Sequence, residues 1–296
     1  MLPGSPAEND IALQKFAVGQ PVRRKEDDTL LRGKGEYTDD ISLPGQAYAW
    51  IVRSSHAHGI IRSIDIEAAR AMPGVLGVWT GKELAAAGYN PFTASLPLKN
   101  RDGSPLLQTN RPALATDRVR YVGDPVAFVV AATPAQARDA AEAVELDIDP
   151  LPAVTGAEDA AKPGAPQLYD HIPNNIALDY HSGDTAALDA AFAKAAHVTR
   201  LDIVNTRLAV APMEPRAALA RYDKATERYI IDVPTQGVAG SRNTLAKLLN
   251  VAPDKVHLLT HNVGGSFGMK AAVYPEYVCL LHAARDLGRP VKWTDE

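Results

Sequence analysis

The stretch VHLLTHNVGGSFGMK, residues 256–270, decides the fold of the second half of the chain. Its apolar and β-branched start predicts a strand over Val256–Val263. A glycine-rich loop follows over Gly264–Lys270. A helix is then expected over Tyr274–Leu287, with Gly288 as its C-cap. A helix also precedes this stretch and a strand begins after it, and this order is typical of an α/β unit.

The loop contains three glycines, Gly264, Gly265 and Gly268, which let the backbone approach a ligand closely and adopt positive φ. Between a strand and a helix, such a loop directs N–H groups outward, where they suit an anionic or oxo ligand. The phosphate-loop pattern is absent, because Met269 stands where that pattern needs lysine. The spacing alone leaves a ligand cradle and a plain tight connection equally open.

Polar residues near this stretch offer further candidates. Gln236 ends the strand predicted over Ile230–Val233 and could donate to a ligand oxygen or cap a turn. His261 directly precedes the loop, where a polar role at the strand end is favoured over a ligand contact. Glu214 and Arg216 could pair with each other or with neighbours, and a structural ion pair is favoured over catalysis.

Three other residues carry chemistry of their own. His56 and His58 have the spacing that places two rings on one face of a strand, but no third or fourth metal ligand is near in sequence. Cys279 lies among apolar residues of the last helix and is interpreted as a buried apolar side chain. As the single cysteine, it excludes an intrachain disulfide and an iron–sulfur cluster held by four cysteines of this chain.

The rest of the chain alternates between strands, short helices and loops. Residues 85–115 are rich in proline, asparagine and glycine and indicate a long surface loop. A compositional break near 156–166 indicates a domain boundary. Strands are predicted over 47–52, 60–66, 75–80, 121–122 with 125–131, 144–150, 175–180, 196–205 and from 290 onward, and helices over 67–71, 133–143 and from a cap at Ser241.

Composition narrows the function class. The 296 residues contain 31 basic and 35 acidic side chains, and the resulting net charge of −4 argues against nucleic-acid binding. No apolar run reaches the roughly 18 residues that a membrane span needs. The first residues lack the features of a secretory signal, so a cytoplasmic location is expected.

Several motifs together resemble a known family. TLLRGKGEYTDD (29–40), YVGDPVAFVVA (121–131), VPTQGVAGSRNT (233–244) and VGGSFGMK (263–270) are similar to the molybdenum-binding subunit of the xanthine dehydrogenase/aldehyde oxidase family, which includes aerobic carbon monoxide dehydrogenases. The resemblance implies an α+β fold. Its parts would be an N-terminal arm (1–27), an α/β-hammerhead domain (28–156) and the first part of a molybdopterin-binding α/β domain (157–296).

The resemblance also implies roles for individual residues. Gln236 matches the glutamine whose amide contacts the apical oxo group of molybdenum. Phe267 and Gly268 match loop residues whose backbone lies against the metal centre, and Gly264 and Gly265 match glycines that let the chain pass close to the cofactor. Ser266 is expected to contact the cofactor with them, although family loops often have glycine there and at Met269.

The activity implied is hydroxylation of an aldehyde, an N-heterocycle or a related small substrate with oxygen taken from water. The cofactor would be molybdenum–molybdopterin in its cytosine dinucleotide form. Electrons would pass to [2Fe–2S] clusters and FAD on a small and a medium partner subunit. No direct metal ligand and no catalytic residue is expected on this chain, because the general base of the family lies downstream of the matched region.

Family subunits are more than twice as long as this chain, which leaves three interpretations open. The chain is a piece of a normal subunit, one part of a natural split subunit, or a scaffold module without catalysis. The first two are favoured because Gln236 and the glycine loop are retained. The isolated chain is expected to be inactive, and a complementary chain is expected to dock on an open strand edge after Trp293.

Overall fold

The computed structural model describes residues 24–94 and 96–296, so most of the expected N-terminal arm lies outside the described residues. The chain divides into two units, Met1–Glu36 and Tyr37–Glu296. In the described part of the first unit, α2 (Asp27–Leu31) has no buried residue. All elements discussed below belong to the second unit.

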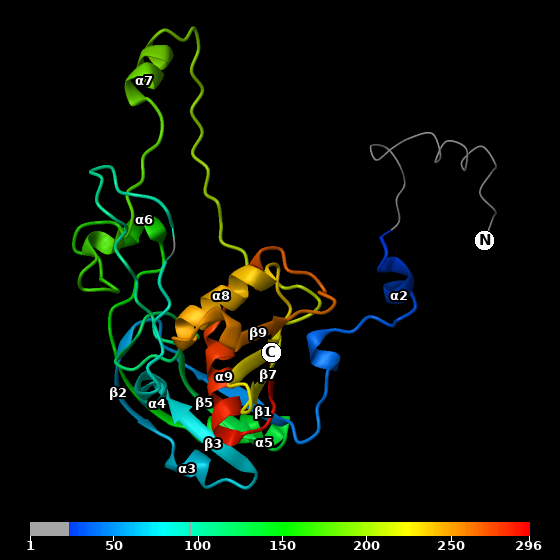
Figure 1. Ribbon diagram of the computed structural model, residues 1–296. Coiled ribbons are helices and arrows are strands. Elements are labelled where there is room, and N and C mark those ends of the chain that lie inside the picture. The colour runs from blue at the N-terminus through cyan, green and yellow to red at the C-terminus, as the bar shows by residue number, and fades with distance from the viewer. Residues whose placement is uncertain (1–23, 95) are drawn as a thin grey trace, which may run out of the picture. The chain divides into compact units, whose positions relative to one another are not determined.

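A seven-stranded sheet forms the framework of the second unit, in the order β3-β5-β1-β10-β7-β8-β9 (Figure 1). β10 pairs in parallel with β1 and antiparallel with β7, so both halves of the chain contribute to one sheet. The expected open edge after Trp293 is therefore wrong, because β10 lies inside the sheet. The strands are β1 (Ala47–Arg53), β3 (Val75–Thr80), β5 (Pro125–Ala131), β7 (Ala217–Asp223), β8 (Arg228–Asp232), β9 (Val256–Leu259) and β10 (Val291–Thr294).

The second half of this sheet contains the α/β unit that the sequence predicts. β8 and β9 are parallel neighbours, and α8 (Val238–Leu249) connects them. Parallel strands need such a crossover because a short turn cannot reverse the chain between them. After β9 the chain passes through the glycine loop into α9 (Pro275–Leu287) and then β10. The loop thus lies at the carboxyl end of β9.

A three-stranded antiparallel sheet in the order β4-β2-β6 accompanies the larger one. Its strands are β2 (Gly59–Asp65), β4 (Arg118–Val119) and β6 (Glu145–Pro150). The packing between them is tight at Gly59, where a Cβ atom would lie 2.4 Å from the Ile148 side chain. Glycine is therefore required at this position.

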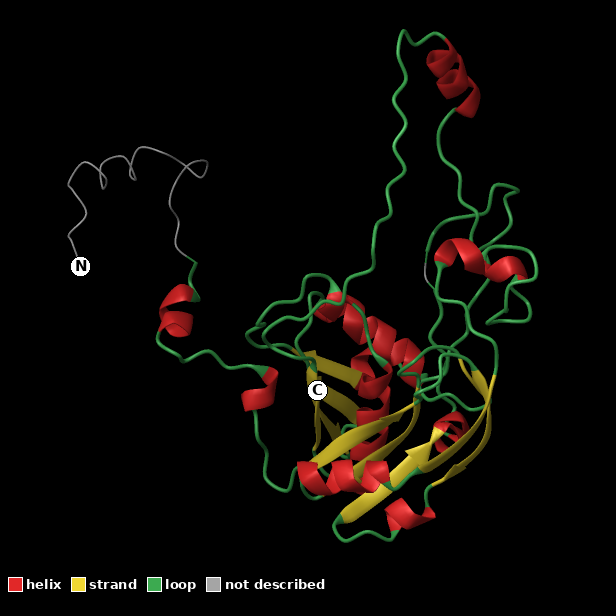
Figure 2. Ribbon diagram, turned by 180° about the vertical axis from the view of Figure 1, so that it is seen from behind, coloured by secondary structure: helices red, strands yellow, loops and turns green. Residues whose placement is uncertain are grey.

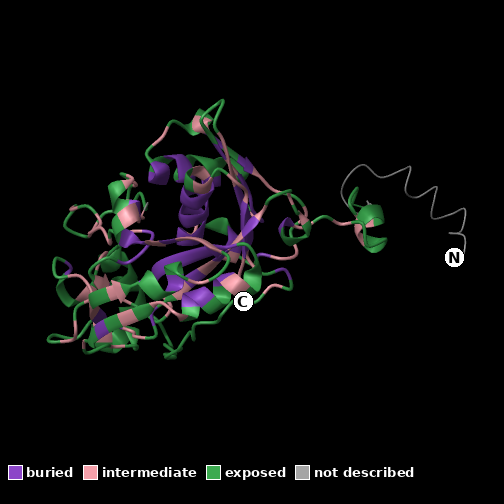
Figure 3. Cartoon of the chain, turned by 90° about the horizontal axis from the view of Figure 1, so that it is seen from below, coloured by how far each residue is buried: buried purple, intermediate pink, exposed green. Residues whose placement is uncertain are grey.

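Helices cover both faces of the large sheet (Figure 2). On β5, Val129 packs with residues of α3 and α5, whereas Phe128 and Val130 pack in the cluster that includes α8 and α9. Burial on both faces explains the uninterrupted apolar run PVAFVVA, whose seven residues are all buried. The buried residues gather in the sheet and the helices packed on it (Figure 3). The remaining helices are α3 (Glu67–Arg70), α4 (Gly81–Ala86), α5 (Pro134–Glu142), α6 (Ala157–Ala160) and α7 (Thr185–Ala193), with 3₁₀ turns η1 (Thr38–Asp40), η2 (Pro173–Asn175), η3 (Pro253–Lys255) and η4 (Met269–Ala271).

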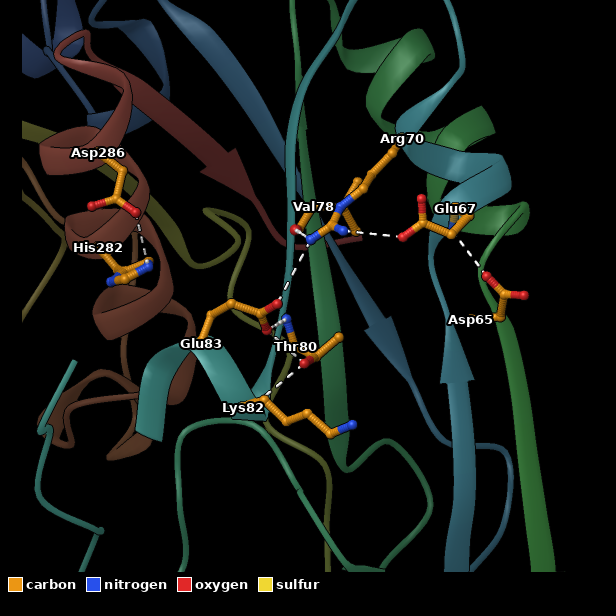
Figure 4. A network of polar contacts seen from close by, with 9 residues as sticks. All are labelled: Asp65, Glu67, Arg70, Val78, Thr80, Lys82, Glu83, His282 and Asp286. Atoms are coloured by element: carbon orange, nitrogen blue, oxygen red, sulfur yellow. Dashed lines mark hydrogen bonds and ion pairs between the residues drawn. The ribbon is translucent and has the colours of Figure 1, made fainter. Parts of the chain in front are cut away.

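Local signals define several helix ends as predicted. Thr133 caps α5 by accepting a hydrogen bond from the Gln136 N–H, and Gly288 ends α9 in a left-handed conformation. A cap that the sequence reasoning missed begins α4. There, the Thr80 N–H donates to Glu83 Oε2 at 2.9 Å and the Lys82 N–H donates to Thr80 Oγ1 (Figure 4).

One long segment contains no buried residue. Residues 181–211 are all exposed, and they comprise α7 and an extended stretch that leads back to β7. The strands predicted over 175–180 and 196–205 are not formed. Alternating apolar residues can form a strand only beside another strand, and no described residue pairs with this stretch. We call residues 196–211 the exposed arm.

Three smaller predictions are corrected. Tyr121 and Val122 lie in a loop after β4, not in a strand. Ser241 lies inside α8, which begins at Val238 with Gly237 as its N-cap. β9 ends at Leu259, four residues earlier than predicted. Among the described residues, no helix has the length and hydropathy needed to cross a membrane.

Candidate functional site

The glycine loop adopts a backbone that few sequences allow. Gly265 and Gly268 have φ values of 100° and 93°, and Phe267 has a φ of 49° with its side chain 81% exposed. Positive φ is unfavourable for a non-glycine residue and marks places where the surrounding structure imposes the conformation. At Gly264 the constraint is steric, because a Cβ atom there would lie 2.5 Å from Glu214 Cβ.

A buried ion pair anchors this loop. Lys270 Nζ donates to Glu214 Oε2 at 2.7 Å and to the Glu214 carbonyl oxygen at 2.8 Å. The Lys270 side chain is fully buried and that of Glu214 is 7% exposed. Glu214 Oε2 also accepts the N–H of Gly264 at 2.7 Å. One carboxylate thus fixes both ends of the loop.

The side chains of Gln236 and Ser266 are hydrogen-bonded to each other. Ser266 Oγ donates to Gln236 Oε1 at 2.6 Å and accepts the Lys270 N–H at 2.9 Å. The Gln236 N–H also donates to the Lys270 carbonyl oxygen at 3.2 Å. Ser266 is buried and Gln236 is exposed, so the amide of Gln236 is the outer end of this hydrogen-bonded chain. The two predicted site residues are therefore in direct contact.

The segment before α8 is tied to the same loop. Thr235 Oγ1 donates to the Lys270 carbonyl oxygen at 3.2 Å and lies 3.1 Å from Ser241 Oγ. It also accepts the N–H of Gly237 at 3.2 Å. These contacts hold the end of β8, the start of α8 and the glycine loop in one arrangement.

The other polar candidates serve the framework. His261 Nε2 lies 3.0 Å from Asp232 Oδ1, which agrees with a polar role at a strand end. Arg216 does not pair with Glu214. Instead its Nη2 lies 2.7 Å from Asp295 Oδ2, its Nη1 lies 3.5 Å from Glu276 Oε2, and its guanidinium covers the ring of Tyr274.

The remaining sequence candidates lie apart from the loop. His56 and His58 are in the turn between β1 and β2, and His58 Nδ1 lies 2.9 Å from the Pro152 carbonyl oxygen. The described residues contain no group of three or more His, Cys, Asp or Glu side chains that could hold a metal ion. Cys279 is fully buried in α9, and burial raises the pKa of its thiol well above the usual range. The prediction of a buried, unreactive cysteine agrees with this position.

A cleft of about 870 Å³ opens beside Gln236. Its walls come from the long loop after α4, the turn after β4, the segment before η2, the start of α8 and the end of η4. Sequence reasoning identified only the loop over 85–115. It missed these side chains because residues distant in sequence form the cleft. The lining residues are Phe92, Thr93, Ala94, Thr109, Arg111, Arg120, Tyr121, Leu168, Tyr169, Gly237, Gly240, Ser241, Thr244, Ala271, Ala272 and Val273.

Two arginines in this cleft lie against aromatic rings. The Arg111 guanidinium lies 5.6 Å from the centre of the Phe92 ring and 5.7 Å from that of Tyr121. Arg120 covers Tyr169 at 4.6 Å. Burial, followed by the nearby Asp124 carboxylate, raises the pKa of Tyr121 to about 12. The phenol oxygen of Tyr121 accepts a hydrogen bond from Arg111 Nη1 at 3.2 Å.

Comparison with known proteins identifies two domains in this chain. Residues 32–152 match the aldehyde oxidase and xanthine dehydrogenase a/b hammerhead domain, and residues 168–296 match the molybdopterin cofactor-binding domain. The 6-hydroxypseudooxynicotine dehydrogenase complex subunit gamma of Paenarthrobacter nicotinovorans is 38% identical over 94% of this chain and 34% of its own length. The carbon monoxide dehydrogenase large chain of Hydrogenophaga pseudoflava is 34% identical over 92% of this chain and 34% of its own.

Solved structures agree with the sequence matches. Quinoline 2-oxidoreductase from Pseudomonas putida 86 superposes with a TM-score of 0.84 and 34% identity, over 95% of this chain and 35% of the other. The reconstituted CO dehydrogenase from Oligotropha carboxidovorans superposes with a TM-score of 0.81 and 32% identity, over 100% of this chain and 37% of the other. The chain thus spans about a third of the length of these relatives. It belongs to the xanthine dehydrogenase/aldehyde oxidase family of molybdopterin oxidoreductases and contains the hammerhead domain and part of the cofactor-binding domain of the molybdenum subunit.

Proposed function

We propose that this chain forms the cofactor-facing N-terminal portion of a molybdenum hydroxylase. In this proposal, Gln236 and the loop residues Gly264, Gly265, Ser266, Phe267 and Gly268 lie against the molybdenum–molybdopterin cofactor. The observation that carries it is the contact between Gln236 and the glycine loop, in which a buried hydrogen-bonded chain supports one exposed carboxamide.

The residues present fit such a cofactor. The N–H groups of Phe267 and Gly268 donate to no other group within residues 24–94 and 96–296. A Cβ atom at Gly268 would meet nothing within 4 Å, so the outer side of the loop is open to a ligand. Fixed donors of this kind stabilise the negative charge of an oxo group, because they need no reorganisation when the ligand binds.

The bound cofactor would supply the redox chemistry and transfer of water-derived oxygen. The chain's own residues would hold it in place. Gln236 would donate from its carboxamide, the loop would contribute N–H donors, and the cleft beside Gly237 would admit the substrate. Its aromatic rings suit a small planar molecule such as an N-heterocycle, and aldehydes remain the alternative.

The remaining parts of the enzyme would lie on other polypeptide segments. We infer that the exposed arm packs against the C-terminal portion of the molybdenum subunit, whether that portion is in the same chain or a separate one. Four large apolar side chains in it are at least 77% exposed, namely Leu201, Ile203, Val204 and Leu208. The CO dehydrogenase match covers the whole of this chain, arm included, with a chain nearly three times as long. The proposed enzyme also contains an FAD-binding medium subunit and a [2Fe–2S] small subunit. Its cofactor is the cytosine dinucleotide form of molybdenum–molybdopterin.

A chimera tests this function. The matched third of the P. nicotinovorans subunit gamma is replaced by this chain and expressed with the rest of that complex. We expect purified chimera to contain molybdenum and to release cytidine monophosphate on acid hydrolysis. We also expect Gln236→Ala to lower substrate-dependent dye reduction at least 10-fold. An assembled chimera without molybdenum, or one in which Gln236→Ala changes nothing, would contradict the proposal. His257→Ala, an exposed change on β9, serves as the control.

A further inference from the structure

We propose that Ser266 is a positioning residue that fixes the carboxamide of Gln236 with its NH₂ group turned outward as a hydrogen-bond donor. This inference rests on the proposed function, in which that carboxamide meets an oxo ligand. A glutamine amide can present either its oxygen or its nitrogen, and the two orientations have nearly the same shape. An oxo ligand accepts hydrogen bonds, so only one orientation suits it.

The direction of the hydrogen bonds determines the orientation. Ser266 Oγ already accepts the Lys270 N–H at 2.9 Å. Its single proton is then available for a different partner, and Gln236 is the side chain within reach. Because Ser266 is only 9% exposed, water cannot readily replace that partner. The serine therefore donates, and the atom facing it must be the acceptor Oε1.

The distance supports the same assignment. Ser266 Oγ and the facing amide atom are 2.6 Å apart. Hydrogen bonds between two oxygen atoms are most often about 2.7–2.8 Å long, whereas those between nitrogen and oxygen are about 2.9–3.0 Å long. An outward-facing oxygen would put the NH₂ group at this unusually short distance. The geometry thus favours oxygen against Ser266 and nitrogen toward the outside.

The serine itself cannot readily move. Its hydrogen bond to the Lys270 N–H ties it to a residue whose side chain is fully buried against Glu214. Met269 N–H also donates to the Ser266 carbonyl oxygen at 2.9 Å. The ion pair therefore holds the loop, the loop holds Ser266, and Ser266 selects one orientation of Gln236.

Nuclear magnetic resonance of the isotope-labelled 296-residue chain tests the inference without any cofactor. The side-chain amide signal of Gln236 is assigned from its loss in Gln236→Met. We expect its order parameter to be near the value of rigid backbone, about 0.85, and to fall below about 0.6 in both Ser266→Ala and Ser266→Gly. In the unmodified chain, the amide protons should show no cross-peak to the Ser266 β protons, since they point away.

Ser241→Ala is the matched control, because it removes a neighbouring buried hydroxyl that contacts Thr235 and not Gln236. It should leave the Gln236 signal unchanged. An unchanged order parameter in both Ser266 variants, or a strong cross-peak to Ser266 in the unmodified chain, would overturn the inference. If the NMR result overturns the inference but Gln236→Ala still lowers the activity of the chimera, the proposed function stands and only the role of Ser266 is rejected.

Discussion

Replacing Lys270 by methionine tests how strongly the buried ion pair stabilises the chain. Methionine fills a similar volume but cannot donate a hydrogen bond. The change leaves the Glu214 carboxylate buried with only the Gly264 N–H on Oε2. Its other oxygen, Oε1, has no hydrogen-bond partner among the described residues even before the substitution. The variant would therefore contain a charge with little compensation.

The magnitude follows from burial. Removing one partner of a buried pair costs about 3–5 kcal/mol, because the remaining charge cannot return to water. Arg62 and Asp149 approach to 2.5 Å, but their side chains are 57% and 49% exposed. Exposed pairs of this kind contribute about 0–1 kcal/mol. Lys270→Met should therefore destabilise the chain several times more than Arg62→Met, although both remove a close contact.

Urea unfolding at pH 7, followed by tryptophan fluorescence, measures both variants. The double variant Glu214→Met with Lys270→Met supplies the sharper comparison. It leaves no buried charge, and its main cost is the unpaired Gly264 N–H, about 1–3 kcal/mol. We expect it to be more stable than Lys270→Met alone. Equal losses for Lys270→Met and Arg62→Met, or a double variant that loses the sum of its single changes, would refute this account of the pair.

Four other outcomes are expected. The Cys279 thiol should react with a thiol reagent only after unfolding, because burial raises its pKa and blocks access; rapid reaction of the native chain would contradict this. Burial lowers the pKa of His282 despite the nearby Asp286 (Figure 4), so the unfolded chain binds a proton more readily. The free energy of unfolding should therefore fall as the pH decreases below 6.5, by at most about 1.4 kcal/mol per pH unit. His282→Gln should make the urea midpoint depend less on pH. Within the second unit (37–296), trypsin should cut the native chain first at Arg200 and Arg207 in the exposed arm, and early fragments from elsewhere in this unit, identified by mass spectrometry, would disagree. Gly268→Ala should cost about 1–2 kcal/mol in urea unfolding because of its positive φ, whereas Gly240→Ala, inside α8, should stabilise by about 0.5–1 kcal/mol; equal effects would reject the backbone argument.

Local rules predicted the elements whose ends depend on a few neighbouring residues. Thr133 and Pro134 begin α5, and Gly288 ends α9, because caps and left-handed glycines act within one turn. Rules of this kind failed where a partner strand decides the outcome. Residues 196–205 have the alternation of a strand but remain extended and exposed. β10 looked terminal in sequence, yet it lies between β1 and β7, a pairing across more than 200 residues for β1.

The candidate site shows the same division. Gln236 and the loop glycines were identified from short motifs, and the structure places Gln236 in contact with the loop. The pairing of Glu214 with Lys270 was not predicted, because 56 residues separate them and Arg216 offered Glu214 a nearer candidate partner. The arginines and aromatic rings of the cleft were missed for a related reason, since five separate segments line it.

Ser266 shows why a departure from a family pattern needs a structure before it can be interpreted. In the sequence, Ser266 stands where family loops often have glycine, and a side chain at such a position could demand a different backbone. In the structure, the positive φ values fall on Gly265, Phe267 and Gly268, so Ser266 lies outside the left-handed positions. Its hydroxyl then adds a hydrogen bond to Gln236 that glycine could not supply. The substitution therefore preserves the path of the loop and restricts the one exposed carboxamide beside it, so a test of Ser266 should measure the orientation of that amide as well as stability.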